Sequence, residues 1–401
     1  MRALWVLVGV VLGVSSMQPA LARAGAPATL TRFASEDAFA TGSLEGTTVD
    51  DGRLTLAPGQ RQGTWTSPSL EPGFTFTRLV ASWNADTPGA SAIRVEVAAT
   101  TGDGERTDWY TLGVWTVDNH AITRTSVAGQ KDALGRVETD TLVSQQSPFT
   151  SYALRISMER SEAEAAPPTV RMLAAQVSAF KYSPDAATSV PLATEAVELG
   201  VPTYSQEVHA RHYPQWGGGG EAWCSPTSTE MVVEFWGRGP SQADLAWVDP
   251  GYADPSIEFA ARGTYDAAYR GTGNWPFNTA YAGRFGLEAF VTQLRSLSEA
   301  ELFIRAGIPL VASIASRPGE LEGFLFPGGT NGHLVVIVGF DANGRPIVND
   351  PAAWSNAGVR RVYDRAQFER VWQRGSGGTV YVIHPPEVPL PAPPAGETPN
   401  W

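Results

Sequence analysis

Residues 221–237 read EAWCSPTSTEMVVEFWG and contain Cys224, the only cysteine of the chain. Apolar side chains recur after it at helical spacing, at Met231, Val232, Phe235 and Trp236. This spacing predicts an amphipathic helix with Ser225 as its N-cap, Pro226 in its first turn and Gly237 at its end. The cysteine therefore lies at the N-terminus of a predicted helix.

A thiol at a helix N-terminus has a chemical environment that favours its thiolate form, because the helix dipole is positive there and backbone N–H groups are free. Cys224 is accordingly a candidate nucleophile. The alternative is that it is a small buried apolar residue, which is the usual fate of an unpaired cysteine.

Composition limits the classes of protein to consider. The chain has 401 residues, of which 43% are hydrophobic and 17% are charged, as in ordinary folded proteins of two or three domains. Its net charge of -12 argues against a nucleic acid or an anionic membrane as partner. A single cysteine excludes an intramolecular disulfide and a cysteine-rich metal site, and no acidic cluster has the spacing of a calcium loop. No cofactor or metal is expected.

The first 24 residues have the pattern of an export signal. Arg2 supplies a positive charge, residues 3–14 are apolar, and Ala20-Leu21-Ala22 or Ala22-Arg23-Ala24 offers a small-residue cleavage site. The apolar run is too short to span a bilayer, which takes about 20 residues. We expect a secreted or extracytoplasmic protein whose mature chain begins near residue 25.

Residues 25–182 are predicted to form an accessory all-β domain. Short runs rich in β-formers alternate with Gly, Pro, Asp and Asn, which favours a jelly-roll-like β-sandwich. Its aromatic residues either belong to the core or line a carbohydrate-binding surface: Trp65, Trp83, Trp109, Tyr110 and Trp115.

A small polar linker is predicted at residues 183–200, and a second domain at residues 201–385. Its patterns predict helices at 224–236, 241–248, 254–261, 278–284, 298–306 and 364–374, with strands at 310–315, 334–340, 346–349 and 379–383. Residues 271–278 are expected to be a loop. The Pro-rich residues 386–401 are predicted to be a disordered tail.

A thiol nucleophile needs a base and a group that orients the base. Of the five histidines, His333 precedes the continuous apolar run at residues 334–338, which is typical of a strand buried on both faces. The end of such a strand is a rigid place to hold a catalytic group. A structural strand-end histidine is the alternative.

The next strand supplies the third group. Residues 341–344 read DANG and predict a hairpin loop. If Phe340 pairs with Arg345, Asp350 lies opposite Val335, and Asp350 and His333 become diagonal neighbours on one sheet face, about 7–8 Å apart at the backbone. A two-residue turn would leave them too far apart for a hydrogen bond.

Acyl transfer also requires a donor for the developing oxyanion. Gln206 and Gln215 both precede Cys224, and spacing alone does not choose between them. A zinc site made by His209, His212 and Cys224 is disfavoured because no fourth ligand has a clear spacing.

Four ordered motifs then resemble one family: VPTYSQ at 201–206, WCSPTS at 223–228, GHLVV at 332–336 and VNDP at 348–351. Together with the segment at 273–278 they resemble papain-like cysteine peptidases of the C-39-like type over about residues 200–385. The resemblance implies a papain-like α+β fold with Cys224 as nucleophile, His333 as base, Asp350 as orienting residue and Gln206 as oxyanion donor. Ser225 departs from the family's usual Gly after the nucleophile.

The predicted function is an exported cysteine peptidase or amidase that acts on a peptide or protein substrate through a thioester intermediate. Two alternatives remain: a non-catalytic cell-surface protein whose N-terminal domain contacts glycan or cell wall, and an acyl transferase that uses the same residues. Neither a nucleic-acid partner nor a membrane span is predicted.

Overall fold

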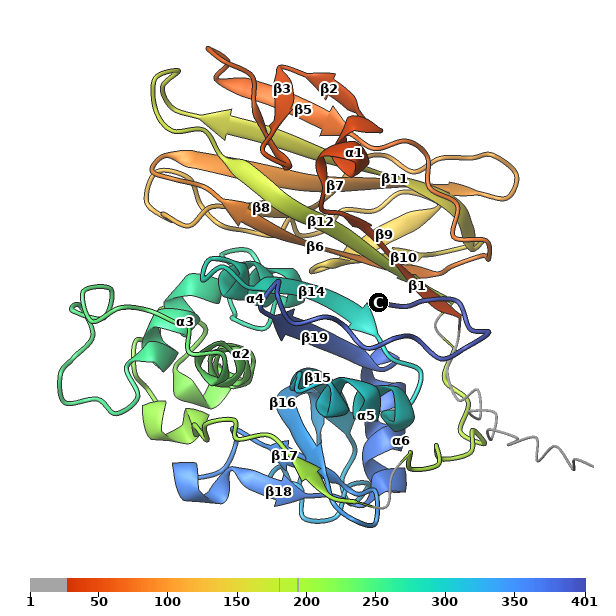
Figure 1. The fold of residues 1–401 in the computed structure, drawn as a ribbon, viewed down its shortest axis with the longest axis vertical. Coiled ribbons are helices and arrows are strands. Elements are labelled where there is room, and N and C mark those ends of the chain that lie inside the picture. Colours follow the sequence, from red (N-terminus) through yellow and green to blue (C-terminus); the bar gives the residue numbers. More distant parts are fainter. Residues whose placement is uncertain (1–26, 180, 193–194) are drawn as a thin grey trace, which may run out of the picture.

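The computed structural model describes residues 27–179, 181–192 and 195–401 (Figure 1). The predicted export signal lies outside these residues. Among the described residues, no helix combines the length and apolar character needed to cross a membrane.

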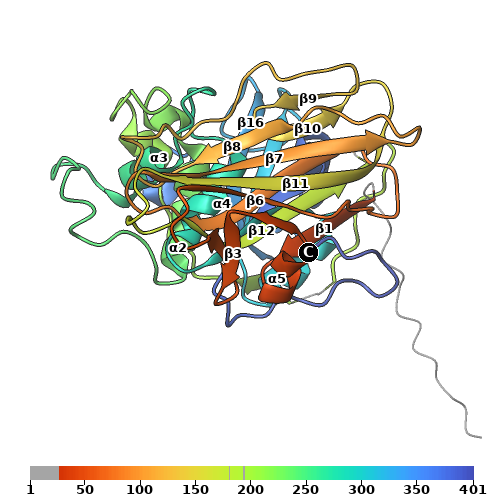
Figure 2. The same ribbon diagram turned by 90° about the horizontal axis from the view of Figure 1, so that it is seen from above.

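The N-terminal part is a two-sheet β-sandwich, which confirms the all-β prediction. Its elements are β1 (Ala28–Phe33), α1 (Glu36–Ala40), β2 (Ser43–Glu45), β3 (Thr47–Asp50), β4 (Arg53–Leu56), β5 (Gln62–Thr66), β6 (Arg78–Asp86), β7 (Ser91–Thr101), β8 (Tyr110–Trp115), β9 (Gly135–Glu138), β10 (Thr141–Ser144), β11 (Phe149–Arg160) and β12 (Thr169–Ser178). One sheet has the order β3-β4-β12-β6-β10-β9, with β1 also paired to β12, and the other has the order β2-β5-β11-β7-β8. Figure 2 shows the long strands of this sandwich running across the second domain.

Four of the five aromatic residues singled out from the sequence belong to the core of the sandwich. Trp65, Trp83 and Trp115 have no exposed surface, and Tyr110 is 3% exposed. Trp109 is half-buried and is covered by the guanidinium groups of two arginines. Of the two roles weighed for these rings, the core role is therefore confirmed for Trp65, Trp83, Tyr110 and Trp115, because alternating strand positions direct them between the two sheets.

The second domain combines helices with a seven-stranded antiparallel sheet. Its elements are β13 (Val197–Glu198), η1 (Gln206–His209), η2 (Gly220–Ala222), α2 (Cys224–Phe235), α3 (Ser256–Thr264), α4 (Trp275–Gly283), β14 (Glu288–Gln293), α5 (Leu297–Arg305), β15 (Leu310–Ser316), β16 (Thr330–Phe340), β17 (Pro346–Asn349), η3 (Asn356–Gly358), β18 (Arg360–Val362), α6 (Arg365–Ser376) and β19 (Thr379–His384). The strand order is β14-β19-β15-β16-β17-β18, with β13 paired to β16. Helices α2 and α4 pack on one face, and α5 and α6 pack on the other.

Several local predictions were wrong in instructive ways. Helix α2 begins at Cys224, so Ser225 lies inside the helix and is not its N-cap. The N-cap position is held by Trp223, whose side chain makes no capping hydrogen bond. Residues 241–248 form turns, and the expected loop at 271–278 contains the start of α4, where Asn274 accepts a hydrogen bond from the backbone N–H of Phe277. Sequence patterns did not reveal β14, the strand that meets the sandwich.

The expected linker and tail are both more ordered than their compositions suggested. Part of the linker forms β13, which pairs with the end of β16. In the tail, Glu397 forms an ion pair with Arg295, Asn400 is fully buried, and Trp401 packs against Phe303. Proline prevents regular structure in this segment but does not prevent packing, so the prediction of a disordered tail was wrong.

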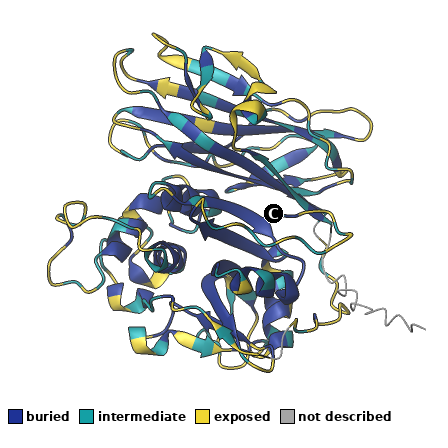
Figure 3. Ribbon diagram, in the orientation of Figure 1, coloured by how far each residue is buried: buried dark blue, intermediate teal, exposed yellow. Residues whose placement is uncertain are grey.

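The sandwich completes the free edge of the second domain's sheet. The side-chain amide of Asn84 on β6 donates to the carbonyl of Ala289 on β14 (2.8 Å) and accepts from its N–H (3.1 Å), and Ser82 accepts from the N–H of Val291. Beside these bonds, Phe277 of α4 packs edge-on against Trp83. Figure 3 shows that buried residues are continuous across this junction. An exposed sheet edge is thereby covered.

A buried arginine ties the sandwich to the C-terminal end of α3. Arg124, 1% exposed, donates to the carbonyls of Thr116, Arg262 and Tyr265. Burial and the charges of neighbouring arginines lower the pKa of Arg124 to about 9. The charge of Asp266 opposes this effect but is smaller. The sandwich is thus bonded to the segment that leads from α3 to α4.

Replacing Asn84 with Ala is predicted to lower the free energy of unfolding by about 2–4 kcal/mol, because two backbone groups of β14 lose their partners inside the interface. Chemical denaturation measures the change. The control is Asn343→Ala at an exposed turn, which is expected to shift stability by less than about 0.5 kcal/mol. Equal effects of the two substitutions would contradict this account of the interface.

Candidate active site

Cys224 occupies the first position of α2 and is partly exposed. The short helix η2 leads into it, and Gly220 of η2 packs so closely on the η1 segment that a Cβ atom there would collide with the carbonyl oxygen of Gln206. The free N–H groups and the dipole of α2 favour negative charge on the sulfur. The structure therefore confirms that the thiol lies at the N-terminus of a helix.

His333 lies near the beginning of β16 and faces Asp350, which directly follows β17. The imidazole Nε2 is 2.7 Å from Oδ1 of the carboxylate, and the two residues are 1% and 0% exposed. Since Nε2 is engaged by the aspartate, Nδ1 is the ring nitrogen left for another partner.

The hairpin that joins these residues differs from the prediction at its tip but not at the site. Phe340 pairs with Pro346, one residue later than expected, because Asp341 accepts hydrogen bonds from the backbone N–H groups of Asn343 and Arg345. An irregularity between Ile337 and Gly339 then shifts the pairing by one residue. Val336 consequently pairs with Asn349, which is the predicted register.

The carboxylate of Asp350 has partners on both oxygens. Oδ1 accepts from the backbone N–H of Ala352 (3.1 Å) as well as facing His333, and Oδ2 accepts from the hydroxyl of Tyr363 (2.9 Å). Burial would raise the pKa of Asp350, but the charge and hydrogen bond of His333, followed by these two donors, hold it below its ordinary value. A carboxylate so bonded stays ionised and fixes the orientation of the imidazole.

The imidazole also interacts with the thiol. Burial would lower the pKa of His333, but the charge and hydrogen bond of Asp350, and then those of Cys224, raise it from 6.5 to about 10. Phe324 and Phe326 flank the ring at centroid distances of 6.0 and 4.9 Å. The structure thus brings Cys224, His333 and Asp350 together from three separate segments.

Gln206 lies beside the chain that approaches the nucleophile. It is 1% exposed, and its amide nitrogen donates to the carbonyl of Glu221 at 2.9 Å. Its backbone N–H donates to the carbonyl of Pro351, directly after Asp350. Gln215 is exposed on the loop. The geometry therefore favours Gln206 over Gln215 as the residue next to the thiol.

Three tyrosines near the site were not identified from the sequence. Tyr363 holds Asp350, and the hydroxyl of Tyr381 is 2.9 Å from that of Ser225. Tyr269 is half-exposed, and burial followed by the charge of Cys224 raises its pKa. Ser225 is fully buried, and its hydroxyl is held against that of Tyr381. No local motif marks these tyrosines, since strand pairing and loop packing bring them in.

The two loop histidines also meet, but not with the cysteine. His209 and His212 converge with Glu258 of α3, and the donor atoms of these three residues lie within 4.8 Å of one another. The zinc arrangement considered from the sequence, with Cys224 as a ligand, therefore does not describe this cluster.

Family comparisons cover both domains. Residues 29–178 match the peptidase C39 N-terminal domain, and residues 198–380 match the peptidase C39-like family. A comparison with curated proteins finds no match.

Similar solved structures are distant. A protein from Bacillus anthracis described as a candidate C39-like peptidase is 19% identical, with 47% of this chain and 97% of that chain covered and a TM-score of 0.31. A xylan-binding module from Roseburia intestinalis is 11% identical, with 38% and 96% covered and a TM-score of 0.20. A protein of the infectious bursal disease virus Gx strain is 12% identical, with 44% and 38% covered and a TM-score of 0.21.

We predict that His333 stays protonated up to about pH 10, as measured by NMR of histidine-labelled protein. Because its pKa is higher in the folded than in the unfolded state, its contribution to stability is complete below pH 6.5 and is lost as the pH rises through about 10. Asp350→Asn removes the largest raising influence, so the pKa should fall. Titration of His333 near 6.5 in the unmodified protein would contradict the proposed ion pair.

Proposed function

Because the chain belongs to the C39-like peptidase family, we propose that it is a papain-like cysteine peptidase with Cys224 as its nucleophile. The observation that carries the proposal is the position of His333, which faces Asp350 through Nε2 and interacts with the thiol of Cys224. A nucleophile, its base and a group that orients the base are the minimum set for acyl transfer. All three residues come from segments whose motifs resemble the family.

In the proposed mechanism the resting site is a thiolate–imidazolium pair. The thiolate of Cys224 attacks the carbonyl carbon of a peptide bond, and the C–N bond breaks as the imidazolium of His333 protonates the leaving amine. The neutral imidazole then takes a proton from water, which attacks the thioester. The C–S bond then breaks as the carboxylic acid leaves, and the sulfur departs as a thiolate beside the protonated imidazole of His333, which restores the resting pair.

Gln206 is the proposed oxyanion donor together with the backbone N–H of Cys224. Its amide nitrogen carries two hydrogens, and the bond to the Glu221 carbonyl uses one of them at good geometry. The second has only a long contact of 3.4 Å with Glu207, so it remains available to a developing oxyanion.

The proposed setting is outside the cytoplasm. This part of the proposal is supported by the positive charge and apolar run of residues 1–24 and by the low pI of about 5.0. The proposed substrate is a peptide or protein, and the sandwich serves as a support for the peptidase domain, since its aromatic residues are buried in its own core.

An electrophilic peptide probe is predicted to label the secreted protein at Cys224. Labelling should vanish in Cys224→Ala and fall strongly in His333→Ala, because the thiol loses the base that holds its proton. Mass spectrometry of the labelled peptide and the labelling rate are the measurements. His120→Ala, at an exposed histidine of the sandwich, is the control. Unchanged labelling in His333→Ala would exclude the proposed pair.

Gln206→Ala is predicted to lower kcat by about 10²–10³ with a smaller change in KM, because the lost hydrogen bond strengthens in the transition state. Steady-state hydrolysis of a peptide substrate that the wild type cleaves measures both constants. Gln215→Ala is the matched control and should leave kcat unchanged. The reverse result would assign the oxyanion contact to Gln215.

A further inference from the structure

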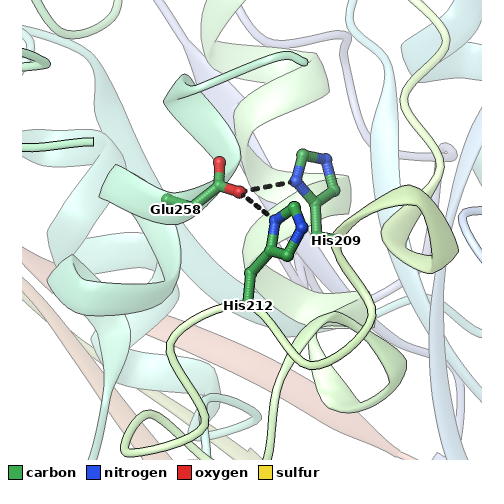
Figure 4. Close-up of side chains that lie close together, drawn as sticks. All are labelled: His209, His212 and Glu258. Carbon is green, nitrogen blue, oxygen red and sulfur yellow. Dashed lines mark hydrogen bonds and ion pairs between the residues drawn. The ribbon is translucent and has the colours of Figure 1, made fainter. Parts of the chain in front are cut away.

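A second cluster of ligand-type side chains lies apart from the proposed catalytic residues (Figure 4). His209 is the last residue of η1, His212 follows it in the loop, and Glu258 projects from α3 toward both. The Nδ1 atoms of the two imidazoles are 2.8 and 2.9 Å from the same carboxylate oxygen. Three donor atoms from two distant segments therefore converge on one point.

The cluster is buried, which makes its charge significant. The side chains of His209 and Glu258 have no exposed surface, and that of His212 is 18% exposed. The ion pairs of Glu258 in the described part of the chain are both with imidazoles, and its second carboxylate oxygen is buried without a hydrogen-bond partner. A buried carboxylate oxygen without a partner is costly, and a bound cation would satisfy it.

A divalent cation satisfies the charge and the unused oxygen together. We propose that His209, His212 and Glu258 bind a zinc ion, with water from the exposed side of His212 completing the coordination. Two imidazole nitrogens and a carboxylate suit zinc, whereas calcium and magnesium prefer oxygen ligands alone. Bond lengths of about 2.0–2.2 Å separate tetrahedral ligand atoms by roughly 3.3 Å, so each imidazole nitrogen would need to move away from the carboxylate oxygen by only a few tenths of an ångström.

The surroundings keep the imidazoles in place for this role. The ring of Tyr252 stacks on that of His212 at 3.5 Å between centroids and 9° between planes. Trp223, which precedes the cysteine, packs at 6.4 Å from the ring of His209. The ligands are thus oriented by packing on both sides.

The zinc ion would fasten the η1 segment to α3. Gln206 is the first residue of η1 and His209 the last, so the metal would hold the segment that carries Gln206 against the body of the domain. Its role is structural, and the inference does not rest on the proposed peptidase activity.

Isothermal titration of zinc chloride into the full chain with Cys224→Ala tests the proposal, because this background removes the thiol that would itself bind zinc. We expect one equivalent of bound zinc and a thermal-unfolding midpoint that rises with zinc concentration. Adding His212→Ala or Glu258→Gln should weaken binding by at least about 100-fold, since each removes a direct ligand and even outer partners contribute about 10–100-fold.

The matched control adds His120→Ala, at an 81% exposed side chain of the sandwich, and should bind zinc as the parent does. Circular dichroism verifies that each variant is folded. His212 is partly exposed and Glu258→Gln preserves shape, so at least one ligand variant is expected to fold. Absence of stoichiometric binding to the parent, or unchanged affinity in a folded ligand variant, would overturn the zinc site whatever the outcome of the peptidase assays.

Discussion

The geometry of the candidate active site is organised around one buried pair, His333 and Asp350. Two charges removed from water are stable only when their geometry is good and their remaining hydrogen-bonding groups are satisfied. The hairpin of β16 and β17 brings the pair together, while Tyr363 and the N–H of Ala352 complete the carboxylate. The fixed carboxylate holds the imidazole in one orientation through Nε2. The direction in which Nδ1 points is therefore set by the protein.

The accessory sandwich makes hydrogen bonds to β14 and α4 of the second domain. Strand β14 would be an open sheet edge, but Asn84 of the sandwich satisfies its backbone as a neighbouring strand would. Asp140, also from the sandwich, accepts a hydrogen bond from the N–H of Trp275, the first residue of α4, and its burial raises its pKa to about 6. Since α4 packs beside α2, whose first residue is Cys224, the sandwich is connected to the site through α4.

The sequence was most informative where function depends on local order. A helix start after Cys224 and a face shared by His333 and Asp350 follow from short-range periodicity, and the latter survived a misplaced turn because a β-bulge restored the register. Glu258 and Tyr363 were not recognised, because nothing near them in the sequence indicates the partner that tertiary packing supplies. The tail was misjudged because proline content reports on regular structure, whereas burial of Asn400 depends on partners elsewhere in the fold.

The segment between Gln206 and Cys224 loses much conformational entropy when it is ordered. It has little regular structure and four consecutive glycines, so the entropy lost on ordering it is large. Yet an oxyanion donor is effective only when it is positioned before the reaction begins. The contacts that order the segment are therefore those that do not depend on its own secondary structure: the backbone bond of Gln206 to Pro351, the close approach of Gly220, and the two histidines that meet Glu258. A metal ion at that last contact would supply, through α3, the rigidity that the glycines remove.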